Sequence, residues 1–102
     1  MDVAMVDKDI ILLDWRQRGF VGGVWIDPPG QEWADYMHDV DELIMVLDGD
    51  VEVEMGGDVV RPEYGQEVLI PAGTKHTVRN VGSLTSRWLY SYKRDQETRS
   101  NK

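Results

Sequence analysis

Apolar and polar residues alternate along much of this chain, which predicts short β-strands that each bury one face. The clearest case is Val51–Met55, in which every second residue is apolar and the residues between are acidic. A period of two is typical of a strand with one face inward and one face in water. Residues 42–47 precede it, and Asp48-Gly49 between the two stretches is a strong hairpin signal. A β-hairpin is therefore predicted near the middle of the chain.

Similar apolar stretches, separated by turn residues, recur along the sequence. We expect strands at residues 8–18, 20–26, 33–38, 42–47, 51–55, 59–61, 67–70, 74–79 and 84–92. The first is assigned from its β-branched and apolar residues, and Gly22-Gly23 in the second predicts a bulge or a close backbone approach. Many short strands without a persuasive helical period predict an all-β sandwich or barrel. From residue 93 the chain is charged, so we expect a flexible tail over 93–102.

Length and charge narrow the classes of function. A chain of 102 residues is predicted to be one domain, 1–102, and the absence of cysteine excludes disulfides and thiolate metal sites. The formal net charge is -8, and no Lys or Arg occurs between residues 19 and 60, so nucleic acid is not expected as a partner. The first residues do not resemble a signal peptide and no apolar run is long enough to span a membrane. We therefore expect a cytoplasmic protein whose acidity serves solubility.

Candidate chemistry is concentrated in two spaced patterns. An imidazole and a carboxylate stand just before the apolar run at 43–47, where a carboxylate is costly unless a partner such as a divalent metal pairs with it. The first pattern consists of Gly30, Tyr36, His38, Glu42 and Gly49, and the second of Gly65, Pro71, Gly73, His76 and Asn80. In order and spacing these resemble the two motifs of the cupin superfamily, and in particular the small single-domain bacterial-type cupins (cupin 2 conserved barrel).

The resemblance implies a double-stranded β-helix, or jelly-roll, barrel with its motifs at residues 30–80. It also implies metal ligands at His38, Glu42 and His76, and these positions use both histidines of the chain. Two histidines and one carboxylate form a set associated with non-haem Fe(II) and tolerated by Mn, Ni, Co and Zn. One divalent metal ion is therefore the expected cofactor.

The chain departs from the family pattern at Tyr36, where cupins usually carry a fourth ligand, histidine. Tyr36 has three interpretations: a fourth ligand as phenolate, a group beside the ligands or in the pocket wall, or a core aromatic. A free phenol ionises near pH ~10, so ligation as phenolate would need a strongly acidic metal. The nearby acids Asp35, Asp39 and Asp41 do not match a calcium loop, and we interpret them as solvated turn residues.

Large side chains could wall an apolar pocket beside the metal. Most of the large residues, which are Trp25, Trp33, Met45, Trp88, Tyr90 and Tyr92, are expected in the core or at a dimer interface. The alternative is that the few that face the barrel lumen form the wall, and the candidates named for it are Trp25, Trp33, Met45, Trp88 and Tyr90.

The resemblance implies a metal-dependent oxygenase or isomerase acting on a small organic molecule. The alternatives are a non-catalytic ligand-binding or sensing module with a degenerate metal site, and a metal-free epimerase-like site using a histidine and Tyr36. The resemblance to cupins further implies a homodimer, because small cupins commonly pack an N-terminal strand against a partner subunit or swap it into that subunit.

Overall fold

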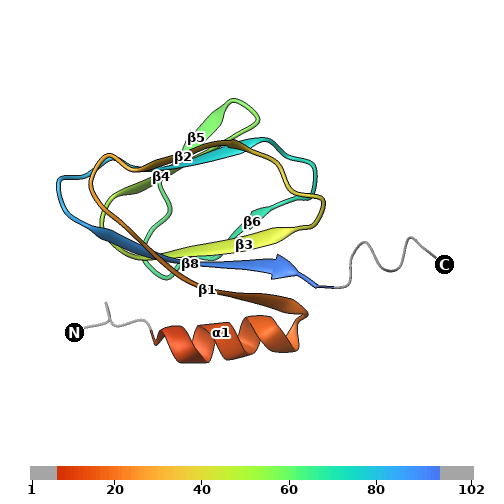
Figure 1. Cartoon of the computed structure of the whole chain (residues 1–102). Helices are drawn as coiled ribbons and strands as arrows, with labels where there is room; N and C mark the ends of the chain where they lie inside the picture. The colour runs from red at the N-terminus through yellow and green to blue at the C-terminus, as the bar shows by residue number, and fades with distance from the viewer. Residues whose placement is uncertain (1–6, 95–102) are drawn as a thin grey trace.

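The chain folds into two facing β-sheets with one helix outside them (Figure 1). The computed structural model describes residues 7–94. One antiparallel sheet has the order β1 (Phe20–Asp27), β8 (Ser86–Lys93), β3 (Glu42–Asp48), β6 (Val68–Ile70). The other has the order β2 (Glu32–Tyr36), β7 (His76–Asn80), β4 (Val51–Met55), β5 (Asp58–Val60). The predicted all-β, jelly-roll class is confirmed, and each expected strand after residue 19 has its counterpart.

Strand β3 is buried on both faces and explains the uninterrupted apolar run in the sequence. Ile44 and Val46 point between the sheets, where they join a cluster that includes Val53 and Trp88. The alternate residues of β3 point outward into a second cluster beneath the helix, made of Trp15, Phe20, Leu43, Met45, Leu47 and Leu89. Because both faces of β3 pack against apolar side chains, the strand lacks the alternation of a half-exposed strand.

The strand expected at residues 8–18 is wrong, because the structure has a helix there, α1 (Lys8–Gln17). Asp7 caps this helix, its Oδ1 accepting hydrogen bonds from the backbone N–H groups of Asp9 and Ile10 at 3.0 and 3.3 Å. Trp15 is 1% exposed and packs on the outer face of the first sheet. Helix packing on this apolar face outweighs the β-branched character of the segment.

Helix α1 is also tied to the loop before β6. The Trp15 indole donates to Glu67 Oε1 at 3.0 Å, and the Arg18 guanidinium donates to both carboxylate oxygens of Glu67 at 2.9 and 2.7 Å. These contacts hold the pKa of Glu67 below its usual value, with the Arg18 hydrogen bonds as the largest cause. The homodimer stays a prediction. The N-terminal strand on which it was based is a helix in the structure.

The Gly22-Gly23 pair marks a close approach, and the β1–β8 register has no irregularity there. A Cβ on Gly22 would lie 1.8 Å from the carbonyl oxygen of Tyr90, so no larger side chain fits. The first two residues of the expected tail, 93–102, are held by the fold: Lys93 ends β8, and Arg94 N–H donates to the carbonyl of Gly19 at 2.8 Å. Residues 95–102 of that tail and the first residues, 1–6, lie outside the described residues.

No helix within 7–94 has the length and apolar character to cross a membrane.

Candidate metal centre and cavity

Three side chains from different elements converge at one end of the space between the sheets. His38 lies in the loop after β2, Glu42 begins β3 and His76 begins β7. Glu42 and His76 are buried, with 3% and 4% exposure, and the His38 side chain is 28% exposed. One potential ligand atom from each of the three lies within 4.8 Å of the others. The three predicted ligands are therefore brought together in the structure.

The turn of the second motif holds the loop of the first. Gly73 N–H donates to the carbonyl of His38, and Ala72 N–H donates to Asp41 Oδ1, both at 2.8 Å. The carbonyl of Asp41 also accepts from Lys93 N–H at 2.9 Å. Asp41 is thus a half-buried acceptor that fixes the loop, and its interpretation as a solvated turn residue is wrong. These bonds set the position of His38 relative to β7 and β8.

The carboxylate of Glu42 lies between the two imidazoles without hydrogen bonding to them. Its Oε1 is 3.4 Å from His38 Nε2 and 3.3 Å from His76 Nε2. Yet this buried oxygen has no hydrogen-bond partner. The two nitrogens are thus within ion-pair distance of the oxygen without meeting the geometry of N–H···O hydrogen bonds, and the three potential ligand atoms lie close together.

The protonation of His76 is constrained from its other ring nitrogen. Nδ1 lies 2.9 Å from the carbonyl oxygen of Thr74, an acceptor, so Nδ1 must carry the proton that forms this bond. In neutral His76 the lone pair is then on Nε2, facing Glu42. The Glu42 carboxylate is the largest cause raising the pKa of His76 above its usual value, and burial opposes it. A proton or a cation is needed at Nε2 to relieve the repulsion.

A divalent metal ion fits this donor set. The donors are two imidazole nitrogens and one carboxylate oxygen, which first-row ions accept. Two atoms bound to one ion at about 2.1 Å and a tetrahedral angle lie roughly 3.4 Å apart, which matches the observed 3.3 and 3.4 Å. The Nδ1 bond of His76 to a carbonyl is the outer contact that usually orients a ligating histidine. The buried oxygen without a partner, Glu42 Oε1, is the atom that such an ion would satisfy.

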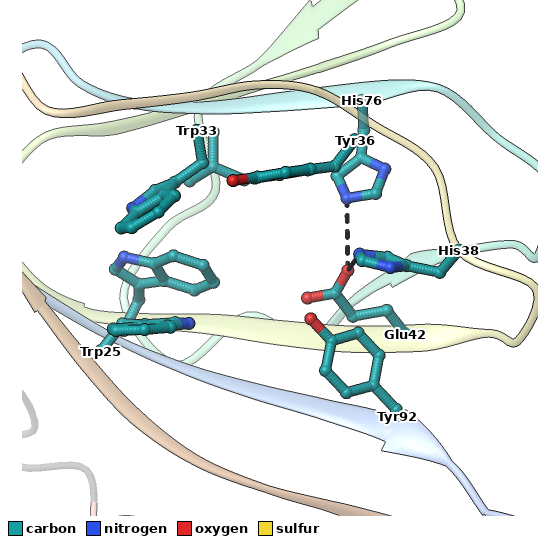
Figure 2. A pocket seen from close by; sticks show the side chains of 9 residues that line it. Trp25, Trp33, Tyr36, His38, Glu42, His76 and Tyr92 are labelled. Atoms are coloured by element: carbon teal, nitrogen blue, oxygen red, sulfur yellow. Dashed lines mark ion pairs between the residues drawn. The ribbon is translucent and has the colours of Figure 1, made fainter.

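A cavity of about 170 Å³ opens beside these three residues (Figure 2). Tryptophan and tyrosine rings form most of its wall. The residues that line it are Trp25, Trp33, Tyr36, His38, Glu42, His76, Val78, Trp88 and Tyr92. The expectation of an apolar pocket next to the ligands therefore has a counterpart in the structure.

A bulge in β2 places Trp33 and Tyr36 in the same wall. Three residue steps in β2 oppose two steps in β7, because Trp33 pairs with Val78 and Tyr36 pairs with His76. In a regular strand, residues three apart point to opposite faces. The extra residue is accommodated by Asp35, which has φ +59° and whose N–H donates to Thr77 Oγ1 at 3.0 Å.

The buried carboxylate of Asp27 supports two of the wall tryptophans. Its Oδ2 accepts from Trp33 Nε1 at 3.0 Å and from Trp88 Nε1 at 2.9 Å. Asp27 is 3% exposed, and the sequence interpretation missed it because it reads only as the start of a turn. The shared hydrogen bonds to Asp27 therefore orient both indole rings.

Tyr36 lies in the wall with its hydroxyl directed toward Trp33 and away from the imidazoles (Figure 2). Of its three interpretations, this placement is that of a wall residue. Met45 does not line the cavity, because it lies on the other face of β3 beneath α1. Tyr90 is also outside the lining and packs against the inner core and the rings of Trp25 and Tyr92.

Tyr92 is a site residue that sequence reasoning missed. It pairs with Glu42 in the β3–β8 register, and its hydroxyl points toward the Glu42 carboxylate (Figure 2). Burial, followed by the charge of Glu42, raises the pKa of Tyr92 to about 12, so the phenol is neutral near pH 7. Only the register between two strands about fifty residues apart could have revealed this placement.

Comparison with known proteins agrees with the fold. The family model described as Cupin domain matches residues 23–92. Polyketide synthase CurC of Streptomyces cyaneus is 30% identical over 73 residues, 71% of this chain and 47% of the relative. The chain thus spans about half the length of this curated relative.

Solved structures are similar over a comparable part of the chain. The cupin domain of Schizosaccharomyces pombe Cnp3 has a TM-score of 0.71 at 21% identity, covering 81% of this chain and 61% of that one. DMSP lyase DddQ from Ruegeria pomeroyi has a TM-score of 0.63 at 27% identity, covering 72% of this chain and 38% of that one.

Proposed function

Because this chain belongs to the cupin domain family, we propose that it binds one divalent metal ion through His38, Glu42 and His76 and holds a small organic ligand beside it. The observation that carries this proposal is the buried Glu42 Oε1, which lies between two imidazole nitrogens and lacks a hydrogen-bond partner. Fe, Mn, Ni, Zn and Co all accept this donor set. A bound ion would supply Lewis-acid polarisation or dioxygen activation, the chemistry of a metal-dependent isomerase or oxygenase.

The chain's own residues would bind and orient the ligand. The aromatic wall makes the surroundings of the cavity apolar, which would strengthen polar contacts at its ligating end. The neutral phenol of Tyr92, next to Glu42, is available as a hydrogen-bond donor to a ligand oxygen. His38 is the more exposed of the two histidines, with 28% of its side chain exposed against 3% for His76.

A second candidate function is non-catalytic ligand binding or sensing, and the placement of Tyr36 favours it. With the Tyr36 hydroxyl directed away from the imidazoles, three side chains are grouped as ligands where the family pattern has four. Fewer ligands would hold the ion less tightly.

Elemental analysis of protein purified without a metal-affinity tag tests the proposal. The wild type should carry close to one ion per chain, and His76→Ala should lose it. Glu42→Gln should lose it as well, whereas Glu63→Gln, a matched change at an exposed glutamate, should not. A metal-free wild type whose Tyr36→His variant acquires metal would support the second candidate. Oxygen consumption or turnover of a bound ligand then separates an enzyme from a sensor.

A further inference from the structure

The cavity has two chemically different ends. Figure 2 shows the imidazoles, Glu42 and the Tyr92 hydroxyl on one side and the indoles of Trp25 and Trp33 on the other. A chain of ring contacts joins the two ends: Trp25–Trp33 at 5.3 Å between centroids, Trp33–Tyr36 at 6.2 Å and Tyr36–His38 at 6.2 Å. A ligand that fills this space must therefore be polar at one end and apolar along the rest.

The apolar half is closed by residues from both sheets. Trp25 comes from β1 and Trp33 from β2, each strand at the edge of its sheet, so their contact joins the two sheets at this side of the cavity. Trp25 is 40% exposed, which places it at the mouth. Trp33 is held by its bond to Asp27. Trp25 packs on the rings of Trp33 and Tyr90. The wall thus presents flat aromatic faces, which favour a flat, rigid ligand over a flexible one.

The volume of the cavity limits the size of that ligand. At about 170 Å³ it is close to the volume of an engineered protein cavity of roughly 150 Å³ that binds benzene. One six-membered ring with a short substituent fills such a space. A fused or long-chain ligand would have to extend out past Trp25.

The charges around the cavity limit the polar end. A divalent ion with one carboxylate and two neutral imidazoles keeps a net charge of about +1, which favours one anionic ligand group. Among the described residues that line the cavity, none is Lys or Arg. A second anionic group on the ligand, away from the ion, would therefore be buried without a partner.

Resting on the proposed metal site, we infer that the ligand is a single-ring aromatic compound with one oxyanion group. The oxyanion would face the ion held by His38, Glu42 and His76. The ring would lie against Trp25, Trp33 and Tyr36, in the offset-stacked or edge-to-face arrangements that aromatic rings prefer. The part of the ring distant from the oxyanion would carry no charge.

Two hydroxamates test the ring preference, because they present the same chelating group with and without a ring. Calorimetric titration of the zinc-loaded protein should show benzohydroxamate binding about tenfold or more tightly than acetohydroxamate, since only the former buries a ring. Zinc is redox-inert, so the measurement reports binding alone. Equal affinities for the two compounds would overturn the inference. So would tighter binding of tetramethylammonium, the kind of cation that aromatic cages hold.

Substitution of Trp25 tests whether the preference for benzohydroxamate comes from the aromatic wall. Trp25→Leu should reduce the benzohydroxamate preference several-fold and leave acetohydroxamate affinity unchanged, and Trp25→Phe should retain most of the preference. Tyr64→Leu serves as the control, because Tyr64 is exposed and lines a different hollow. A preference that survives Trp25→Leu in full would overturn the placement of the ring.

Repeating the titrations in metal-free protein separates this inference from the proposed function. The ring preference comes from the wall and should persist, with both affinities lowered. If the protein takes up no zinc but still prefers the aromatic compound, the metal proposal fails and the ring surface stands. If zinc binds with the expected stoichiometry and the preference is absent, the proposed function stands and the ligand class is wrong.

Discussion

Nε2 of His76 and Oε1 of Glu42 lie 3.3 Å apart, and the buried oxygen forms no hydrogen bond. With Nδ1 of His76 donating to Thr74, the facing atoms are a lone pair and a carboxylate oxygen. Either a proton on Nε2 or a cation between the residues stabilises this arrangement. Protons and metal ions are therefore expected to compete for one site, and the stability of the protein should depend on which of them is bound.

The metal-free protein should lose stability as the pH rises above neutrality. The pKa of His76 is raised by Glu42 in the folded state. The contribution of the protonated form is complete below the unfolded value, about 6.5, and is lost as the pH rises through the raised folded value. Thermal unfolding with a chelator present between pH 6 and 9 measures this trend. His76→Gln should flatten it, and a wild-type melting temperature that increases over the interval would contradict the account.

The stabilisation caused by zinc should have the opposite pH dependence. Because the ion needs His76 unprotonated, the increase in melting temperature caused by zinc should grow with pH through the same interval. The comparison is made at one fixed excess of zinc over protein. An increase that is independent of pH would mean that His76 is not a ligand.

Glu42→Gln should stabilise the metal-free protein at a pH above the raised pKa of His76, while it abolishes binding of the metal. Once His76 has lost the proton on Nε2, the buried carboxylate faces a lone pair, whereas an amide can donate a hydrogen bond to that nitrogen. We expect a gain of about 1–2 kcal/mol in the free energy of unfolding. Urea unfolding measures it, and Glu63→Gln at the exposed control position should change stability by less than about 0.5 kcal/mol. A strongly destabilised Glu42→Gln would argue for a purely structural carboxylate.

Asp27→Ala should destabilise the protein by about 2–4 kcal/mol, because two indole N–H groups lose their shared acceptor. Asp27→Asn keeps an acceptor oxygen and should cost about half as much. Urea unfolding gives the stabilities, and benzohydroxamate titration shows whether the wall is disturbed. If both variants unfold like the wild type, the bonds of Asp27 to Trp33 and Trp88 do not support the wall.

Asp35 provides a test of the bulge that places Tyr36 in the wall. Asp35→Gly tolerates φ +59° and should be neutral or slightly stabilising. Asp35→Val should lose about 1–3 kcal/mol, because a β-branched residue is strained in that region. The valine variant should also weaken benzohydroxamate binding, and unchanged affinity would separate the bulge from the site.

The grouping of the three candidate ligands was predictable, and the composition of the cavity wall was predictable only in part. The resemblance of the two motifs to those of cupins implied that His38, Glu42 and His76 lie together, and the structure groups them. An unbroken apolar run does not show which alternate residues face inward, and this is why Met45 was misplaced. The side on which Trp33 lies relative to Tyr36 depends on one inserted residue in β2, for which the sequence carried no clear signal.

The helix was missed for a different reason. Local β-branched residues indicated a strand. The N-cap at Asp7 and the four-residue spacing of Ile11 and Trp15, which places both on the side of the helix that faces the sheet, are instead those of an α-helix. Tyr92 depends on strand register, which needs the three-dimensional pairing of β3 with β8. These features are decided by tertiary contacts, which local pattern does not report.

Titration of metal-free protein with Co²⁺, followed by visible absorbance, tests the central claim most directly. The wild type should bind one equivalent with the absorbance bands of a nitrogen- and oxygen-ligated ion, and His38→Ala, Glu42→Gln and His76→Ala should each abolish or severely weaken the signal. Glu63→Gln should titrate like the wild type. A wild type that shows no cobalt bands, or a signal that survives His76→Ala unchanged, would contradict a metal centre at these three residues.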